Sequence, residues 1–484
     1  NTITLKANTA NPFASSARYI FEIDTTDLFN SPLKRTQYVT QMGSVIKAPF
    51  DKWTFPLILS PDSTVYFWRV RRDDPDTLTY RWRESSFQYI SNKRGWGQSH
   101  FFQFLKGDKF DYIDTNRIPR YFDLDFQSHT IEVISRNTNA VPGKYSRFFM
   151  NSVQQSAGSL LIFPPEPHVV VSLINPVTGY VLKNTGNGDY GSHASLNLAG
   201  IKRFEFKTGN SAQQNILSNF LQDSILPGTK VILYTCSNHN LGDILGGNNP
   251  LTTNPGLVQA FQSIGGTQFP NIQNNLPYIL VGRKGGAAVE KIGESSVDTL
   301  TFVYDSIAIK RESGYIYSEI IGPSSKWKSM HWRYVSEANS SDSISITVTG
   351  IKNDGTDSIL IKNISKDSLD IDNLDSSISA AAYPYLQLQA WVKDSIKRTP
   401  PQLTYWRIYY DGVHDAALNP VKHYLPPNTS VQQGDSIKMS VAIENIGDYD
   451  MDSLWVDFWV IDANRNKDSV TSMKMDSLLI DSFL

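Results

Sequence analysis

The sequence predicts a mainly β protein in which several β-sandwich domains surround one inserted α/β domain. Short runs rich in β-branched and aromatic residues, separated by Asn, Asp, Gly, Ser and Pro, recur along the 484 residues. Apolar residues at helical spacing join such runs between residues 165 and 294. Hydrophobic residues make up 40% of the chain and aromatic residues 12%, which is enough for several packed cores and excludes a wholly disordered chain.

Charge and cysteine content exclude several classes of protein. The chain has 45 Lys and Arg against 47 Asp and Glu, so its formal net charge of -2 gives no electrostatic footprint for nucleic acid. No apolar run approaches the ~20 residues of a membrane span. A single cysteine, Cys236, excludes an internal disulfide and any zinc site built from several cysteines. We therefore expect no nucleic-acid partner and no membrane span.

The first domain is expected over residues 1–95. The run Thr64–Arg71 alternates so that Tyr66, Trp68 and Val70 share one face, which a facing sheet would bury. This run resembles the penultimate strand of a fibronectin type III domain, in which a Tyr anchors the corner and an Arg-Val pair follows. The resemblance implies a β-sandwich.

A connector, partly β, is expected over residues 96–164. The segment Lys93–Phe104 is rich in aromatic residues, which either pin a connector to its neighbours or line a surface groove. The Pro-rich Phe163–Pro167 predicts a break between strands, because proline removes a backbone donor.

Residues 165–294 predict an α/β domain with strands and helices in alternation. Asn254 and Pro255 suit the N-cap and first position of a helix, and Gly265-Gly266 suits its end. The expected elements are the strand Val169–Ile174, the helix Ser211–Asp223, the strand Lys230–Thr235, the helix from Pro255 to Gly265 and the strand Pro277–Gly282.

The order of six segments in this block resembles the interleukin-like EMT inducer (PANDER-like) domain. Those segments are Val171–Gly179, Phe204–Thr208, Leu217–Leu221, Pro227–Leu233, the helix that ends at Ile264-Gly265, and Tyr278–Gly286. The resemblance implies a compact, non-catalytic domain, with related modules that bind carbohydrate. Metazoan members contain disulfides, which a chain with Cys236 alone cannot form.

Two further β domains are expected towards the C-terminus. Residues 295–412 resemble the jelly-roll sandwich of large secreted Bacteroidetes proteins, with strands expected at Ser343–Thr349 and Tyr385–Val392 among others. Residues 413–484 are similar to the CARDB (cell-adhesion-related) immunoglobulin-like module and are expected to be an incomplete domain. There, Ser436–Gly447 alternates strictly and predicts a strand with Ile437 and Met439 on one face.

No motif predicts a reactive centre, a metal or a cofactor. Cys236 is followed by His239, but a buried structural cysteine is the simpler interpretation. The eight histidines show no zinc-ligand spacing. The acidic run 367–375 fits either a solvated turn or a calcium-binding loop. Recurrent Asp-Ser-aliphatic tripeptides such as Asp394-Ser395-Ile396 fit turns, and they also resemble the O-glycosylation acceptor of exported Bacteroidetes proteins.

The candidate ligand-binding residues follow the first strand of the α/β domain. Tyr180, Asn187, Asp189, Tyr190 and His193 occupy one long polar loop, where stacking and hydrogen bonding to a glycan could combine. The alternative is an ordinary surface loop.

These features predict a non-catalytic adhesion or spacer segment of a secreted or cell-surface bacterial protein. The expected location is extracellular or the outer-membrane surface, and the expected partner of the α/β domain is a glycan or a surface protein. The alternative is an accessory region of a gingipain-like peptidase or of a type IX secretion sortase-like protein, with its catalytic domain outside this chain. A glycoside-active enzyme is a third hypothesis, without a supporting motif.

Overall fold

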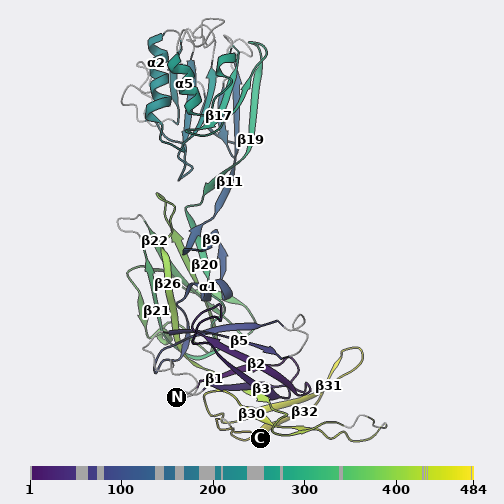
Figure 1. Cartoon of the computed structure of the whole chain (residues 1–484). Helices are drawn as coiled ribbons and strands as arrows, with labels where there is room; N and C mark the ends of the chain where they lie inside the picture. Colours follow the sequence, from purple (N-terminus) through teal and green to yellow (C-terminus); the bar gives the residue numbers. More distant parts are fainter. Residues whose placement is uncertain are drawn as a thin grey trace.

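The chain forms an elongated assembly of β units, with 53% of its residues in strands and 9% in helices, and the mainly β prediction is confirmed. An α/β unit lies at one end, a central sandwich follows, and an N-terminal sandwich and a C-terminal unit lie at the other end (Figure 1). The computed structural model describes residues 3–50, 64–73, 81–136, 146–157, 168–184, 202–208, 211–236, 255–272, 276–336, 342–427, 430, 432, 434–480 and 482–483.

The N-terminal sandwich packs a two-stranded sheet against a four-stranded sheet of order β3-β2-β5-β6. Tyr66 is fully buried between them and Trp68 and Val70 pack against the same core, as the alternation predicts. Phe67, on the opposite face, is also buried and meets His100 edge-on at 5.1 Å. The strands are β1 (Ile3–Asn8), β2 (Ala17–Asp24), β3 (Arg35–Gln41), β4 (Val45–Phe50), β5 (Thr64–Arg72) and β6 (Arg83–Tyr89).

The central sandwich has a five-stranded sheet, β23-β22-β25-β20-β8, and a four-stranded sheet, β24-β21-β26-β7. Its strands are β7 (Gly95–Gln98), β8 (Lys109–Asp111), β20 (Ser313–Tyr317), β21 (Ser324–Val335), β22 (Ser343–Ile351), β23 (Asp357–Ser365), β24 (Asp370–Asp372), β25 (Tyr385–Lys393) and β26 (Gln402–Gly412). Helix α1 (Phe101–Gly107), the hairpin β9 (Ile113–Arg117) and β10 (Arg120–Leu124), and the 3-10 turn η4 (Leu374–Ser376) accompany them.

Three tryptophans form the centre of this sandwich. Trp327, Trp332 and Trp406 are fully buried. Each indole N–H has an acceptor, as buried tryptophans require. The acceptors are the carbonyl of Tyr383 at 3.0 Å, the carbonyl of Ser368 at 2.9 Å and Oε1 of Gln98 at 2.6 Å, respectively.

The α/β unit contains one nine-stranded sheet whose central strands are buried on both faces. Leu217 and Phe261 of the helices cover one face, and Ile131 and Phe302 of outer strands cover the other. The strands are β11 (Phe126–Arg136), β12 (Arg147–Met150), β13 (Val153–Ala157), β14 (His168–Ile174), β15 (Phe204–Lys207), β16 (Lys230–Cys236), β17 (Tyr278–Arg283), β18 (Val289–Ile292) and β19 (Thr299–Lys310). The helical elements are α2 (Ser211–Asn219), η2 (Phe220–Ser224), α5 (Pro255–Ser263) and η3 (Phe269–Asn271).

The five elements expected in the α/β block are present. The apolar run at Val169–Ile174 becomes β14, in which every residue is buried. Helix α5 ends before Gly265, whose φ of +88° suits glycine. A Cβ at this position would lie 2.4 Å from the carbonyl oxygen of Gly286, so no other residue fits.

The predicted domain boundaries differ from those of the structure. Residues 96–164 are not a connector, because β7 and β8 belong to the central sandwich while β11, β12 and β13 belong to the α/β unit. The central sandwich therefore comprises residues 95–124 and 313–412, and the α/β unit, residues 126–310, is inserted between them. The reason is long-range pairing: β8 joins β20, and β7 joins β26.

The C-terminal unit consists of short strands and one long hairpin. The run Ser436–Gly447 does not form the single strand expected, because Ile437 and Met439 are 57% and 45% exposed and Ala442 and Glu444 are buried instead. Glu444 accepts from Asn419 at 2.7 Å and pairs with Lys47 of the N-terminal sandwich at 3.2 Å. The strands are β27 (Ala416–Leu418), β28 (Tyr424–Leu425), β29 (Ser440–Val441), β30 (Ile443–Asn445), β31 (Leu454–Ile461) and β32 (Lys467–Met475).

Among the described residues, no helix combines the length and the apolar character that crossing a bilayer would need.

Candidate functional site

Tyr180 is the one predicted ligand-binding residue that the structure describes, since Asn187, Asp189, Tyr190 and His193 lie outside the described residues. Tyr180 is 58% exposed. The Tyr180 hydroxyl donates to Oε2 of Glu312 at 3.0 Å. Glu312 directly precedes β20, so Tyr180 lies at the junction between the α/β unit and the central sandwich.

A tight turn after β14 brings Tyr180 to this junction. Oδ1 of Asn175 accepts the backbone N–H groups of Val177 at 2.8 Å and Thr178 at 2.9 Å. Gly179 follows with a φ of +68°, and a Cβ there would lie 2.0 Å from the side chain of Ile309. The turn therefore lies directly on β19, with the Thr178 carbonyl and the Tyr180 ring directed towards the central sandwich.

A second loop, after β25, reaches the same point from the central sandwich. Asp394 is 1% exposed and accepts the backbone N–H groups of Ile396 and Thr399 at 2.9 and 3.0 Å, so this Asp-Ser-Ile tripeptide forms a turn. Arg398 follows in the left-handed region, with a φ of +62°. Its side chain is 3% exposed.

Arg398 contacts three groups across the junction. Its Nη2 donates to the Thr178 carbonyl at 2.9 Å, and its Nη1 lies 3.5 Å from Oε2 of Glu312. The guanidinium also lies 5.3 Å from the centre of the Tyr180 ring. Lys393 completes the group, with Nζ 3.4 Å from Oε1 of Glu312. We call Thr178, Tyr180, Glu312, Lys393 and Arg398 the junction cluster.

The charges of the junction cluster hold Glu312 ionised. Partial burial alone would raise the pKa of its carboxyl group. The hydrogen bond from Tyr180 and the positive charges of Lys393 and Arg398 outweigh burial and lower that pKa below its ordinary value. The arrangement therefore favours a charged, multiply bonded carboxylate that joins two units.

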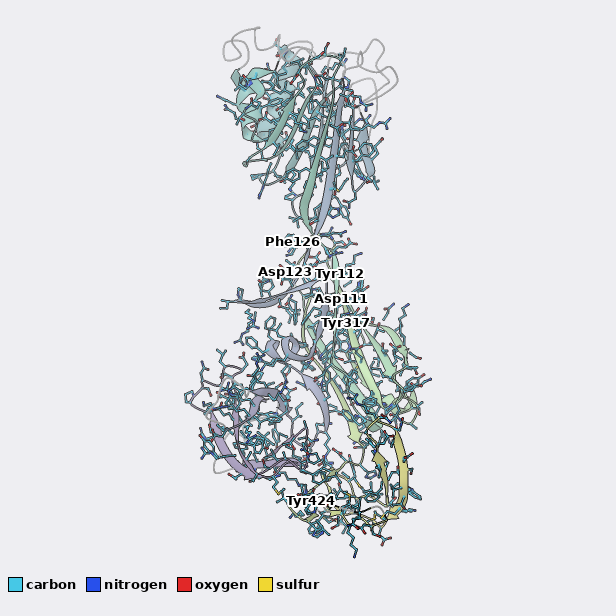
Figure 2. The ribbon with its side chains drawn as sticks, turned by 90° about the vertical axis from the view of Figure 1, so that its right-hand side faces the viewer. Asp111, Tyr112, Asp123, Phe126, Tyr317 and Tyr424 are labelled. Carbon is cyan, nitrogen blue, oxygen red and sulfur yellow. The ribbon has the colours of Figure 1, made fainter. Side chains whose placement is uncertain are left out.

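Two strands carry the chain across the same junction. β11 and β19 pair antiparallel from Phe126 opposite Lys310, with a bulge between His129 and Ile131. Below the pair, Nζ of Lys310 lies 2.6 Å from Oδ1 of Asp123. Figure 2 shows Phe126 and Asp123 at the narrow neck of the molecule, with Tyr112, Asp111 and Tyr317 next along it.

A cleft of about 750 Å³ lies beside the junction cluster. Tyr112, His129, Lys202 and Arg311 line it together with Tyr180. The Arg311 guanidinium lies over the Tyr112 ring at 4.0 Å, and burial together with Arg311 lowers the pKa of His129. His129 is thus expected to be neutral at pH 7. The cleft offers aromatic rings, a neutral imidazole and positively charged side chains as binding groups.

Cys236 is buried, and burial raises the pKa of its thiol to about 12. A protonated thiol in an apolar core is a poor nucleophile, which fits the structural interpretation of this residue. His239 lies outside the described residues.

Two carboxylates of the acidic run 367–375 form salt bridges. Asp370 lies 2.7 Å from Nδ1 of His331 and 2.8 Å from Nη2 of Arg333, and the hydrogen bond from Arg333 lowers its pKa. Asp375 pairs with Lys326 at 3.3 Å. No group of three metal-ligating side chains is found within the described ranges.

The aromatic residues of Lys93–Phe104 pack onto neighbouring elements. Trp96 lies 6.2 Å from Trp406 between ring centroids and donates its indole N–H to Glu319 at 2.7 Å. Phe101 lies 5.3 Å from Phe122. These contacts fix β7 and α1 to the central sandwich.

Comparisons with known proteins give only weak similarity. No protein-family model and no curated protein matches the chain. Among solved structures, an alpha-L-rhamnosidase from Dictyoglumus thermophilum aligns over 94% of this chain and 48% of its own, at 9% identity and a TM-score of 0.14. The chain thus spans about half the length of that enzyme, and the similarity is too low to support an argument about fold or function.

Proposed function

We propose that this chain is a non-catalytic adhesion and spacer segment of a secreted or surface-exposed bacterial protein. In this role it holds the α/β unit at a fixed orientation on a strut of β-sandwiches. The observation that carries the proposal is the junction cluster, in which Arg398 of the strut binds Thr178 of the α/β unit. The sequence resemblances to secreted Bacteroidetes proteins support the extracellular location.

Two features restrict rotation of the α/β unit relative to the strut. Domains joined by a single polar linker generally move relative to each other, because few contacts cross the boundary. Here the chain crosses twice, in the paired strands β11 and β19. Side chains from both units then bind one shared carboxylate, Glu312, beside the crossing. A hinge at this position would have to separate the buried Arg398 from its partners, which disfavours bending.

The orientation of the α/β unit can be measured by distances between spin labels. Labels on Asn219→Cys and Ser358→Cys would occupy exposed positions on the two units, while the native Cys236 is buried and protected from labelling. We expect a single narrow distance distribution for the otherwise unaltered chain, and a clearly broader one after Arg398→Ala.

The matched control is Arg465→Ala, which removes an arginine with a similar φ, +65°, from the distant C-terminal hairpin. It should leave the distribution narrow. A broad distribution in the unaltered chain, or no broadening on loss of Arg398, would contradict the proposal of a rigid spacer.

A further inference from the structure

The outer face of the five-stranded sheet in the central sandwich carries three aromatic side chains. Tyr315 and Tyr317 on β20, and Trp391 on β25, are half-buried. The residues between and beside them, Ile316 and Ala390, are fully buried in the core. Because side chains alternate along a strand, the three rings therefore point away from the core.

The strand register places the rings in two rows that cross the sheet. Tyr315 pairs directly with Trp391, and Tyr317 pairs with Gln389. Directly opposed residues have Cβ atoms ~5 Å apart, so the residues of one row lie side by side. Along β20, the rings of Tyr315 and Tyr317 have centroids 6.2 Å apart at an angle of 30°. The first row contains Asp111, Tyr315, Trp391 and Ser345, and the second contains Lys109, Tyr317, Gln389 and Thr347.

Polar groups surround the rings at their edges. The side chains of Gln389 and Asp111 lie near the Tyr317 hydroxyl. Burial, the largest cause, raises the pKa of this hydroxyl above its ordinary value, while Gln389 lowers that pKa and Asp111 raises it. Nζ of Lys109 lies 5.1 Å from the centre of the Tyr317 ring. Figure 2 shows Asp111 and Tyr317 close together at the end of the sandwich that adjoins the neck. Rings with hydroxyl, amide and carboxylate groups at their edges are thus held in place before any ligand arrives.

The face is hollowed rather than flat. The three rings line a groove of about 940 Å³ together with residues of the edge strand β23. That strand is irregular, with register shifts between Ile346 and Thr349 of its partner β22 and a φ of +55° at Asn363. Bulges bend an edge strand, and here the bent strand lines the groove opposite the tyrosines. We call this feature the aromatic groove.

The charges around the aromatic groove nearly balance. Asp111, Asp367, Lys362 and Lys366 line it, two of each sign, and Lys109 beside the Tyr317 ring adds one positive charge that is paired with Asp111 at 3.4 Å. A groove with so little net charge gives an anionic chain little electrostatic advantage over a neutral one. Tyr112 and Tyr315 also line the neighbouring junction cleft, so a ligand longer than the groove could continue towards the neck.

We propose that the aromatic groove binds a neutral oligosaccharide. The apolar C–H faces of sugar rings stack on aromatic side chains, and sugar hydroxyls exchange hydrogen bonds with groups such as Gln389 and Asp111. The groove offers both kinds of contact in adjacent rows, and its nearly balanced charge gives no strong preference for an anionic ligand over a neutral one. This inference rests on the proposed function and deepens it. It assigns a ligand class to the adhesive segment and places the ligand-binding site on the central sandwich.

The test is a binding measurement with an array of neutral plant, fungal and animal oligosaccharides, with polygalacturonate and heparin hexasaccharides as the anionic probes. We expect at least one neutral oligosaccharide to bind, with affinity reduced at least about tenfold by Trp391→Ala, because stacking on one aromatic ring commonly contributes this much. Tyr317→Phe keeps the ring and should weaken binding less. Trp455→Ala is the matched control, because Trp455 is 65% exposed on the distant strand β31.

Each outcome decides the proposal. Binding that is lost in Trp391→Ala and retained in Trp455→Ala would support it. No neutral binding, binding unaffected by Trp391→Ala, or binding only of the anionic hexasaccharides would overturn it. Spin-label distances on the same variants separate the two proposals: a narrow distribution without glycan binding would remove the groove proposal and leave the rigid spacer intact. A circular-dichroism spectrum unchanged in Trp391→Ala excludes unfolding as the cause of lost binding.

Discussion

Asp108, the residue after helix α1, is a buried carboxyl group whose replacement should stabilise the protein. Its Oδ1 accepts from Nε2 of Gln98 at 2.8 Å, while its Oδ2 is buried without a hydrogen-bond partner among the described residues. Burial, reinforced by the nearby charge of Glu319, raises the pKa of Asp108 from 3.8 to about 8. Asp108→Asn keeps an oxygen that can accept from Gln98 and removes the ionisation.

The magnitude follows from the shift in pKa. Because the folded pKa lies above the unfolded one, the folded state binds the proton more tightly. The stabilising contribution is complete below about pH 4 and is lost progressively as the pH rises to about 8. One pKa unit corresponds to ~1.4 kcal/mol, so the shift from 3.8 to about 8 sets an upper bound of roughly 6 kcal/mol. We expect Asp108→Asn to stabilise the central sandwich by at least about 2 kcal/mol at pH 8 and by little at pH 4.

Urea unfolding between pH 4 and pH 9 measures this effect. Tryptophan fluorescence can follow the central sandwich, because Trp327, Trp332 and Trp406 are all buried in it. The stability of the wild type should fall as the pH rises from 4 to 8, whereas the stability of Asp108→Asn should change much less. The control Asp372→Asn, at an exposed position of the same unit, should behave as wild type. Equal pH slopes for wild type and Asp108→Asn, or a less stable Asn variant at pH 8, would refute the reasoning.

Two further predictions concern buried side chains. Trp406→Phe should destabilise the central sandwich by about 2–4 kcal/mol, because the substitution leaves a cavity and removes the indole N–H that donates to Gln98. Urea unfolding measures this loss of stability, with Phe126→Leu at an exposed position as the control. A loss below about 0.5 kcal/mol would contradict the packing described. Cys236 should resist alkylation by iodoacetamide at pH 8 in the folded chain and react in 8 M urea, because burial raises its pKa to about 12; rapid labelling of the folded chain would disprove its burial.

Local patterns identified the elements of the α/β unit but not its limits. The continuous apolar run at Val169–Ile174 and the capping residues around Pro255 and Gly265 act within one element, so sequence alone reveals them. The pairing of β8 with β20 depends on residues separated by the whole insertion, and no local signal marks it. The sequence does not predict helix α1 for a related reason, because its Phe104 packs against Trp406, which lies far away in the sequence.

The candidate sites show the same division. The sequence predicts Tyr180 as a ligand-binding residue, and in the structure its hydroxyl is hydrogen-bonded to Glu312, which follows it by 132 residues. The alternation of Tyr315 and Tyr317 around Ile316 is a sequence signal for two aromatic side chains on one face of a strand. Their alignment with Trp391 was not, since strand register depends on the folded sheet.

The insertion of the α/β unit into the central sandwich also orders events during synthesis. Every strand of the inserted unit has left the ribosome once Lys310 has emerged, whereas β8 has no partner until β20 is made. The first strands of the central sandwich therefore stay unpaired while the α/β unit, residues 126–310, is translated and folds. During this time apolar residues such as Phe104 and Phe122, which are buried in the finished sandwich, remain exposed to solvent. A folded insertion brings Asp125 and Arg311 together and so shortens the loop that the sandwich has to close. Folding of the α/β unit thus brings the two halves of the central sandwich together before that sandwich can close.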